Sequence, residues 1–246
     1  MKFTCNTSIL AEACNIVQRG VPQKSTIPAT EGIFMQAKNG KLVLTGYDLE
    51  VGITTAIDCS VETDGSVVLN ARLLCDILRR LPSAAVTINV DSHNLCKITS
   101  GESEFSLVGI PANDYPELPT VSSGVPFAIK QGILRDMVKQ TIFAVSTNDT
   151  KIVHTGIKFE IKRGQIRLIA VDGFRLAIRT EQIKYTGDDI SFIVPAKTLS
   201  EVIKLIDNAD VVSMNIAKRH IIFDIGNYSI ISRLLDGEFL DYNAAI

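Results

Sequence analysis

The sequence has little of what metal sites and disulfide scaffolds are built from. Its five cysteines contain no C-x-x-C pair, and their odd number disfavours a disulfide framework. We expect them to be buried, reduced thiols. The three histidines, His93, His154 and His220, include no pair at the three- or four-residue spacing of a metal-binding helix. The sequence therefore predicts no metal and no other cofactor.

Long apolar segments are also missing. No run approaches the roughly 18 residues of a membrane span, and the N-terminal stretch MKFTCNTSILAEACN lacks the apolar core of a signal peptide. We therefore expect a cytoplasmic protein without a membrane partner.

With 246 residues, of which 46% are apolar, the chain can bury two cores of ordinary domain size. Its net charge of −2 argues against a generic nucleic-acid binder.

The chain contains two copies of one unit. LTGYDLEVGIT at 44–54 and IAVDGFRLAIR at 169–179 each run from an apolar strand through a turn into a second strand. The two turn aspartates, Asp48 and Asp172, lie 124 residues apart. The same offset separates two pairs of glycines, Gly32 from Gly156 and Gly40 from Gly164. An offset that recurs across several motifs indicates an internal repeat.

The predicted elements follow the same order in each repeat. A strand leads into a helix, then a hairpin, a further strand, a second helix and two closing strands. The predicted helices cover residues 8–19, 70–80, 130–140 and 196–207. Apolar Ile221, Phe223 and Ile225 alternate with polar residues, as in a sheet with one wet face.

These elements predict an α+β fold of two repeated domains, each with two helices packed on antiparallel sheet. We place the domains at residues 1–120 and 126–246. The Pro-, Ser- and Gly-rich stretch PELPTVSSGVPF at 116–127 is the predicted linker.

Catalytic motifs are weak. GVPQKST at 20–26 places Lys24 as in a phosphate-binding loop, but glutamine stands at two positions where such a loop needs glycine. Asp172 and Gly173 beside Arg175 combine an acid with a base, although Asp-Gly in a hairpin is first of all turn chemistry. A nucleotide-binding hydrolase using Lys24 and Asp172 remains an alternative without a complete motif.

Positive charge gathers on the predicted helices. The four helical segments carry nine Lys and Arg against five Asp and Glu, although the whole chain is negative. Solvated helix faces explain such a bias in any single helix, but a bias in both repeats favours a shared basic surface. Without a base-reading motif, that surface would bind DNA without sequence preference. Lys24 and Lys151, each in the loop after the first helix of its repeat, would extend it.

The order and spacing of five motifs carry a family resemblance. They are MKFT at 1–4, LTGYDLE at 44–50, SGESEFSLVGIPANDYPELP at 100–119, VDGFRLA at 171–177 and LLDGEFLDY at 234–242. Through them the chain, from Met1 to about Tyr242, resembles the first two domains of the bacterial sliding clamp, the β subunit of DNA polymerase III. The resemblance implies the DNA-clamp fold, in which repeated domains form a ring around duplex DNA with helices lining the hole.

The resemblance also implies a function without catalysis. Family members are processivity factors, so we expect an accessory subunit and not an enzyme. Its implied partners are duplex DNA of any sequence and, through short peptide motifs, the polymerase III catalytic subunit, the clamp loader and repair polymerases. A bacterial, nucleoid-associated location in the cytoplasm follows from the same resemblance.

Matching to the family assigns the candidate site residues. Lys24, Arg72 and Lys151 match basic positions near DNA, and Arg79, Arg80 and Lys197 are added because they lie on predicted basic helices. The candidate peptide groove consists of His154, Val171, Gly173, Arg175, Leu176, Leu240, Asp241, Tyr242 and Ala245. Gly173 would permit close backbone approach, and Leu176 would receive apolar anchors. The alternative for Val171 and Leu176 is a place in the hairpin core.

The sequence departs from the family pattern at four positions. Leu240 replaces a proline, Ala244 stands where many relatives have arginine, and Ile152 and Val153 stand where some carry tyrosines in the DNA-facing loop.

The largest departure is length. Clamps of this family close a six-domain ring as a head-to-tail dimer of three-domain chains, whereas this sequence stops at NAAI, where the linker to a third domain would begin. We expect a fragment rather than a natural short form. Alternatives are a ring-incompetent fragment or a paralogue that only binds peptides.

Overall fold

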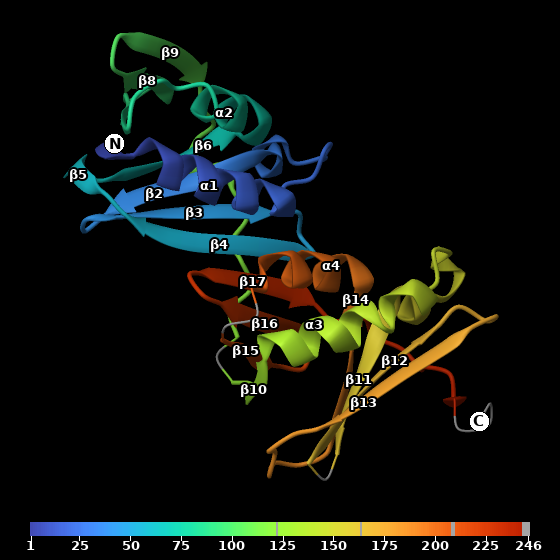
Figure 1. The fold of residues 1–246 in the computed structure, drawn as a ribbon. Coiled ribbons are helices and arrows are strands. Elements are labelled where there is room, and N and C mark those ends of the chain that lie inside the picture. Colours follow the sequence, from blue (N-terminus) through green and yellow to red (C-terminus); the bar gives the residue numbers. More distant parts are fainter. Residues whose placement is uncertain (122, 163, 208–209, 243–246) are drawn as a thin grey trace. The chain divides into compact units, whose positions relative to one another are not determined.

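A computed structural model describes residues 1–121, 123–162, 164–207 and 210–242 (Figure 1). The chain divides into two compact units. The first consists of Met1–Leu118 with Asn227–Ser229, and the second of Pro119–Gly226 with Ile230–Ile246. In the described part of the chain, no helix has the length and apolar character to cross a membrane.

The first unit contains two antiparallel sets of strands and two helices. One set, in the order β5-β1-β7-β8-β9, consists of β1 (Lys2–Asn6), β5 (Ser60–Thr63), β7 (Ala85–Val90), β8 (Leu95–Ser100) and β9 (Ser103–Val108). The other, in the order β6-β2-β3-β4, consists of β2 (Gly32–Lys38), β3 (Lys41–Tyr47), β4 (Val51–Asp58) and β6 (Gly65–Asn70). Helices α1 (Thr7–Val17) and α2 (Ala71–Leu78) contact each other and pack on the second set. Short 3₁₀ turns cover Gln18–Gly20, Pro28–Glu31 and Ala112–Asp114.

The second unit repeats this plan. Strands β11 (Gly156–Lys162), β12 (Gln165–Val171), β13 (Leu176–Gln182) and β14 (Ile190–Pro195) pair in the order β13-β12-β11-β14. Strands β10 (Val125–Lys130), β15 (Val211–Ile216), β16 (His220–Ile225) and β17 (Tyr228–Arg233) follow in the order β10-β15-β16-β17. Helices α3 (Gln131–Lys139) and α4 (Ala196–Leu205) lie side by side on the strands (Figure 1). Two 3₁₀ segments cover Ile142–Ala144 and Asp149–Thr155.

The predicted α+β repeat is confirmed. Strands β2 and β11 have equal length and begin 124 residues apart, as do β3 and β12. The prediction of two closing strands was wrong, because three strands close each unit: β7 to β9 in the first and β15 to β17 in the second. A three-strand meander also replaces the single predicted hairpin, since β2 pairs with β3 before β3 pairs with β4. Alternation alone does not reveal these extra strands, because their turns are short.

The twin turns share one hydrogen-bond pattern. Asp48 Oδ1 accepts the backbone N–H groups of Glu50 and Val51, at 2.9 and 2.6 Å. Asp172 Oδ1 likewise accepts from the two residues that close its own turn. The residue after each aspartate is left-handed, with φ of 75° at Leu49 and 93° at Gly173. The aspartate, and not the glycine, is therefore what the two turns have in common.

The helices end earlier than the sequence predicts, and this changes the charge distribution. Arg79 is the C-cap of α2 and Arg80 follows in the next turn, so both were predicted to be helical but lie outside the helix. Lys130 belongs to β10 and Arg19 to a 3₁₀ turn. The four α-helices, all within the described residues, therefore carry five cations against four acids. The predicted basic bias comes from residues just beyond the helix ends.

Buried apolar side chains fill both units. Phe3, Leu10 and Leu74 are fully buried in the first, and Phe159 and Phe223 in the second. Ile221, Phe223 and Ile225 point inward as predicted, whereas Asp224 between them is exposed. The prediction of reduced cysteines is confirmed, since all five are free and all but half-buried Cys59 are buried. Burial raises the pKa of the Cys5 and Cys96 thiols to about 12, so both stay protonated and unreactive.

Candidate functional site

Lys24 and Arg72, two of the four DNA-contact candidates in the first unit, line one hollow. Its volume is about 760 Å³, and it lies between the loop after α1 and the start of α2. The loop is fixed by the backbone N–H of Ser25, which donates to Glu31 Oε1 at 2.9 Å. Asn70 caps α2 by accepting the N–H of Leu73 at 3.0 Å. Two exposed cations therefore stand beside a helix N-terminus, an arrangement that attracts phosphate.

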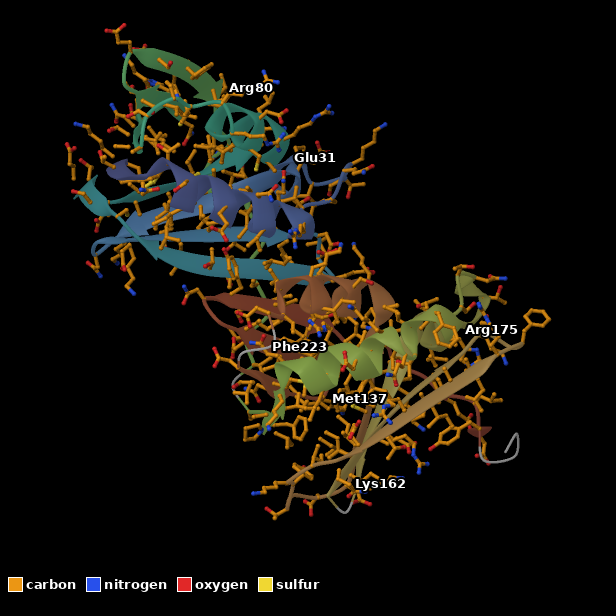
Figure 2. All side chains as sticks on the ribbon, in the orientation of Figure 1. Glu31, Arg80, Met137, Lys162, Arg175 and Phe223 are labelled. Carbon is orange, nitrogen blue, oxygen red and sulfur yellow. The ribbon has the colours of Figure 1, made fainter. Side chains whose placement is uncertain are left out.

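The remaining DNA-contact candidates are exposed but dispersed. Arg79 forms an ion pair with Asp76 at 3.5 Å, and Arg80 is exposed in the turn after α2 (Figure 2). Lys197 is exposed on the first turn of α4. Lys151 lies in the 3₁₀ segment at a point where its backbone departs from helical geometry, with φ −125° and ψ 89°. These cations remain candidates through charge and exposure.

Ile152 and Val153, which depart from the family pattern, lie in this 3₁₀ segment and differ in exposure. Ile152 is half exposed, whereas Val153 is buried. Val153 therefore belongs to the core, and Ile152 presents an apolar side chain at the surface.

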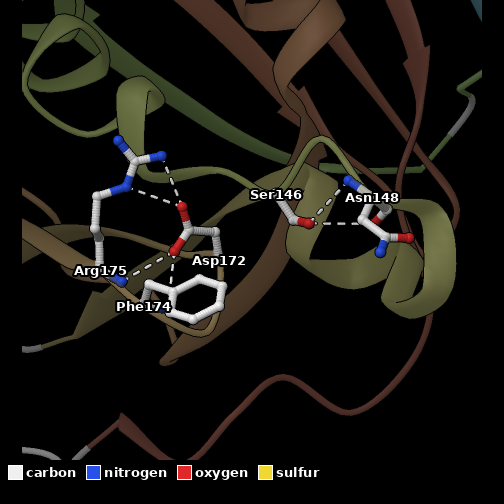
Figure 3. A network of polar contacts seen from close by, with 5 residues as sticks. All are labelled: Ser146, Asn148, Asp172, Phe174 and Arg175. Carbon is white, nitrogen blue, oxygen red and sulfur yellow. Dashed lines mark hydrogen bonds and ion pairs between the residues drawn. The ribbon is translucent and has the colours of Figure 1, made fainter.

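The turn after β12 holds four members of the candidate peptide groove. Val171 and Leu176 face each other across the β12–β13 register, with Val171 buried and Leu176 half-buried. Arg175 donates two hydrogen bonds from its guanidinium to Asp172 Oδ2, at 2.9 and 2.7 Å (Figure 3). Hydrogen bonds from Phe174 and Arg175 lower the pKa of Asp172 to about 2. The carboxylate of Asp172 is thus engaged in holding its own turn, as that of Asp48 is in the twin turn.

The chain after β17 crosses the sheet and meets His154. The Phe239 ring lies edge-on to the His154 ring, with centroids 5.3 Å apart. Lys158 Nζ lies 5.6 Å from the Phe239 centroid and 5.7 Å from that of Tyr242. Burial, and then the nearby Lys151 charge, lower the pKa of His154, so its ring is neutral at physiological pH. These contacts place the residues before and after Leu240.

Tyr242 is the buried end of this segment. Its hydroxyl donates to Glu160 Oε2 at 2.7 Å and accepts from Arg167 Nη1 at 3.3 Å. Burial opposes ionisation of Glu160, but hydrogen bonds from Lys158 and Tyr242 outweigh it and lower the pKa of the carboxyl. Tyr242 is therefore an anchor of the segment, and Leu240, with 43% of its surface exposed, is the side chain that it leaves open to a ligand.

Two candidate positions at the C-terminal end are less informative. Asp241 is exposed, and Ala244 and Ala245 lie outside the described residues.

Sequence matching missed the most exposed large side chain of this region. Phe174 has 97% of its surface exposed at the tip of the turn, between Gly173 and Arg175. The Cβ that a side chain at Gly173 would add meets no atom within 4 Å, so backbone conformation and not crowding favours glycine there. An aromatic residue beside a turn glycine was the available signal in the sequence.

Comparison with known proteins gives a consistent result. Residues 1–119 match the model of the DNA polymerase III beta subunit N-terminal domain, and residues 128–241 match that of its central domain. The beta sliding clamp of Bacillus subtilis is 33% identical over all of this chain and 68% of its own. The B. subtilis sliding-clamp structure superposes with a TM-score of 0.97 at 32% identity, over all of this chain and 67% of that one.

A second structure agrees. The sliding clamp of Pseudomonas aeruginosa bound to griselimycin gives a TM-score of 0.93 at 29% identity, over all of this chain and 68% of that one. The chain thus spans about two thirds of the length of the relatives that it matches.

Proposed function

Because the chain belongs to the family of DNA polymerase III beta subunits, with the sliding-clamp fold in both units, we propose that it acts as a sliding clamp. In this function it encircles duplex DNA without sequence preference and holds a replicative polymerase there without catalysing a reaction. The observation that carries the proposal is the match of both units, in order, to consecutive domains of that family. The bacterial cytoplasm is the location that such a function requires.

We assign DNA contact to the exposed cations beside the helix ends. Lys24 and Arg72 are the strongest pair because they line one hollow. Lys151, Lys197, Arg79 and Arg80 would add weaker, screened attraction. Each phosphate neutralised changes the slope of log K against log salt by about 0.9.

The DNA test uses fluorescence anisotropy with two 30-bp duplexes of unrelated sequence. We expect equal affinity for both, and a slope that is shallower by about 1.8 in the Lys24→Ala/Arg72→Ala variant. The control removes two exposed cations from strand ends and loops, Lys38→Ala/Lys184→Ala, and should leave the slope closer to that of the wild type. Equal slopes in the two variants would reject the assignment.

Peptide capture is assigned to the turn after β12 and the segment around Leu240. His154, Val171 and Leu176 would contact apolar anchors, Gly173 and Arg175 would admit the peptide backbone, and Asp241 would lie at the rim. The P. aeruginosa relative, which was solved with griselimycin bound, supports the existence of a ligand site in the family. An array of overlapping peptides from the catalytic subunit of the organism's own polymerase tests the assignment, with Leu176→Asp as the variant that should lose binding.

Encirclement requires enough domains to close a ring. Three copies of this two-unit chain would supply the six domains that the resemblance implies. Light scattering over a concentration range distinguishes a closed trimer from a species near the monomer mass of 26.8 kDa. A monomer would limit this chain to DNA and peptide contact without a closed ring.

A further inference from the structure

Another hollow lies in the second unit. Its volume is about 740 Å³, and its lining carries several charged side chains. We call it the basic hollow. Its positive charge comes from Lys218 and Arg219, in the turn between β15 and β16, and from Arg233, at the end of β17. A backbone hydrogen bond joins the two segments, since the N–H of Leu234 donates to the carbonyl of Arg219 at 2.8 Å. The backbone positions that carry the three cations are therefore held together by the sheet.

The three cations make no ion pair with any other described residue. All three are exposed, so each is available to a ligand. Burial, and then the charges of Arg233 and Arg219, lower the pKa of nearby His220, as expected beside uncompensated positive charge. The three cations therefore favour an anionic ligand.

Two acidic residues in the same lining decide which anion fits. They are Asp236 and Glu238, from the segment after β17. Their carboxylates repel a ligand with several closely spaced negative charges, such as a phosphate group or a nucleic-acid backbone. A single carboxylate carries less charge and is repelled less, and an arginine fork matches its two oxygens.

The basic hollow borders the candidate peptide groove. Phe239 lines the hollow, and the same ring packs against His154, a member of the groove. The next residue along the chain is Leu240, the exposed apolar member of the groove. One extended peptide of a few residues would therefore contact both.

We propose that the basic hollow binds acidic side chains of the same partner peptide whose apolar anchors enter the groove. The preferred ligand is thus an apolar motif flanked on one side by Asp or Glu. The inference deepens the proposed function and rests on its peptide-binding part. The cations Lys218, Arg219 and Arg233 then set which peptides bind well and leave the apolar anchor unchanged.

The test starts from an unbiased library of random 12-residue peptides displayed on phage. It is panned against the wild type, the Arg219→Ala/Arg233→Ala variant and the single-charge control Lys184→Ala. We expect Asp and Glu to be enriched beside apolar anchors in peptides selected by the wild type and the control. The double variant should select the same anchors without the acidic enrichment.

The strongest wild-type peptide is then synthesised with its acidic residues and with Gln or Asn in their place. Exposed ion pairs contribute little each, so the amide peptide should bind about three- to tenfold more weakly to the wild type. The two peptides should bind equally to the double variant. Because the comparison within the wild type needs no variant, it decides the question even if the double variant folds poorly.

Each other outcome has a distinct meaning. Apolar peptides selected without acidic residues, or equal binding of acid and amide peptides, would overturn the inference and leave the proposed peptide groove intact. A preference for acid that survives in the double variant would overturn the assignment to this hollow. Failure of the wild type to select any peptide would reject both proposals.

Discussion

Removing one oxygen atom, in Tyr242→Phe, tests whether the segment after β17 is anchored as described. The hydroxyl bonds two charged partners, donating to Glu160 and accepting from Arg167. Without it, Glu160 keeps Lys158 as a partner at 2.8 Å but loses its second donor, and its side chain is only 10% exposed. The phenylalanine ring would still fill the space, so the change isolates the hydrogen bonds.

The expected loss is moderate. A hydrogen bond to a charged group contributes about 1.5–3 kcal/mol. The short bond to Glu160 accounts for most of it, since the contact from Arg167 is long at 3.3 Å. We therefore expect about 2 kcal/mol of destabilisation of the second unit, which corresponds to a fall in Tm of roughly 5–8 °C.

Urea denaturation followed by circular dichroism measures this loss, since the chain has no tryptophan for fluorescence. Tyr185→Phe is the matched control, because its hydroxyl donates to the carbonyl of Asp188 at an exposed position. A double-mutant cycle with Glu160→Gln measures the pair directly. Stability of Tyr242→Phe within about 0.5 kcal/mol of the control would refute the anchor.

Three further predictions concern the same turns and rings. Gly173→Ala should lower the free energy of unfolding by about 1 kcal/mol, through the strain of a left-handed backbone alone. Leu49→Gly relieves the same strain in the twin turn, so it should leave the urea unfolding midpoint almost unchanged. The pKa values of His154 and His220 are lowered in the folded state, so the unfolded chain takes up protons first as the pH falls. The free energy of unfolding should therefore hold above pH 6.5, the ordinary histidine pKa, and fall below it, with a smaller fall in His154→Asn. A flat profile of urea midpoints from pH 7.5 to 5.5 would contradict this. We also expect Phe174→Ser to weaken peptide binding about tenfold by anisotropy without changing Tm, because this exposed ring lies between the groove candidates Gly173 and Arg175; unchanged affinity would show that Phe174 does not contact the peptide.

The sequence predicts the repeat well because the repeat depends on turn positions that few residue types can occupy. The aspartates at 48 and 172 satisfy two backbone donors each, and only Asp and Asn readily make such bonds at that position. The paired glycines Gly40 and Gly164 both have positive φ, at 75° and 74°. Such local requirements are visible in a sequence without any tertiary information.

Element ends and side-chain partners depend on tertiary structure and were less predictable. Arg79 and Arg80 continue the helical pattern of α2, yet the helix stops at Leu78, so their charge belongs to the following turn. Tyr242 was expected in a groove, and its burial against Glu160 depends on strands 82 residues away. The basic hollow joins four segments that are separate in sequence, and no spacing indicates it.

The duplication creates a risk of mispairing while the chain folds, because strands of one copy have equivalents in the other. In their own sheets, Glu160 faces Arg167 and Gln36 faces Val43 at the equivalent register. If the two copies exchanged strands, Glu160 would lie against Val43, and its carboxylate would lose the hydrogen bond from Tyr242 and keep Lys158, which lies on its own strand. A buried carboxylate with fewer partners is less stable, so divergence at this cross-strand pair favours each copy's own sheet over the exchanged pairing.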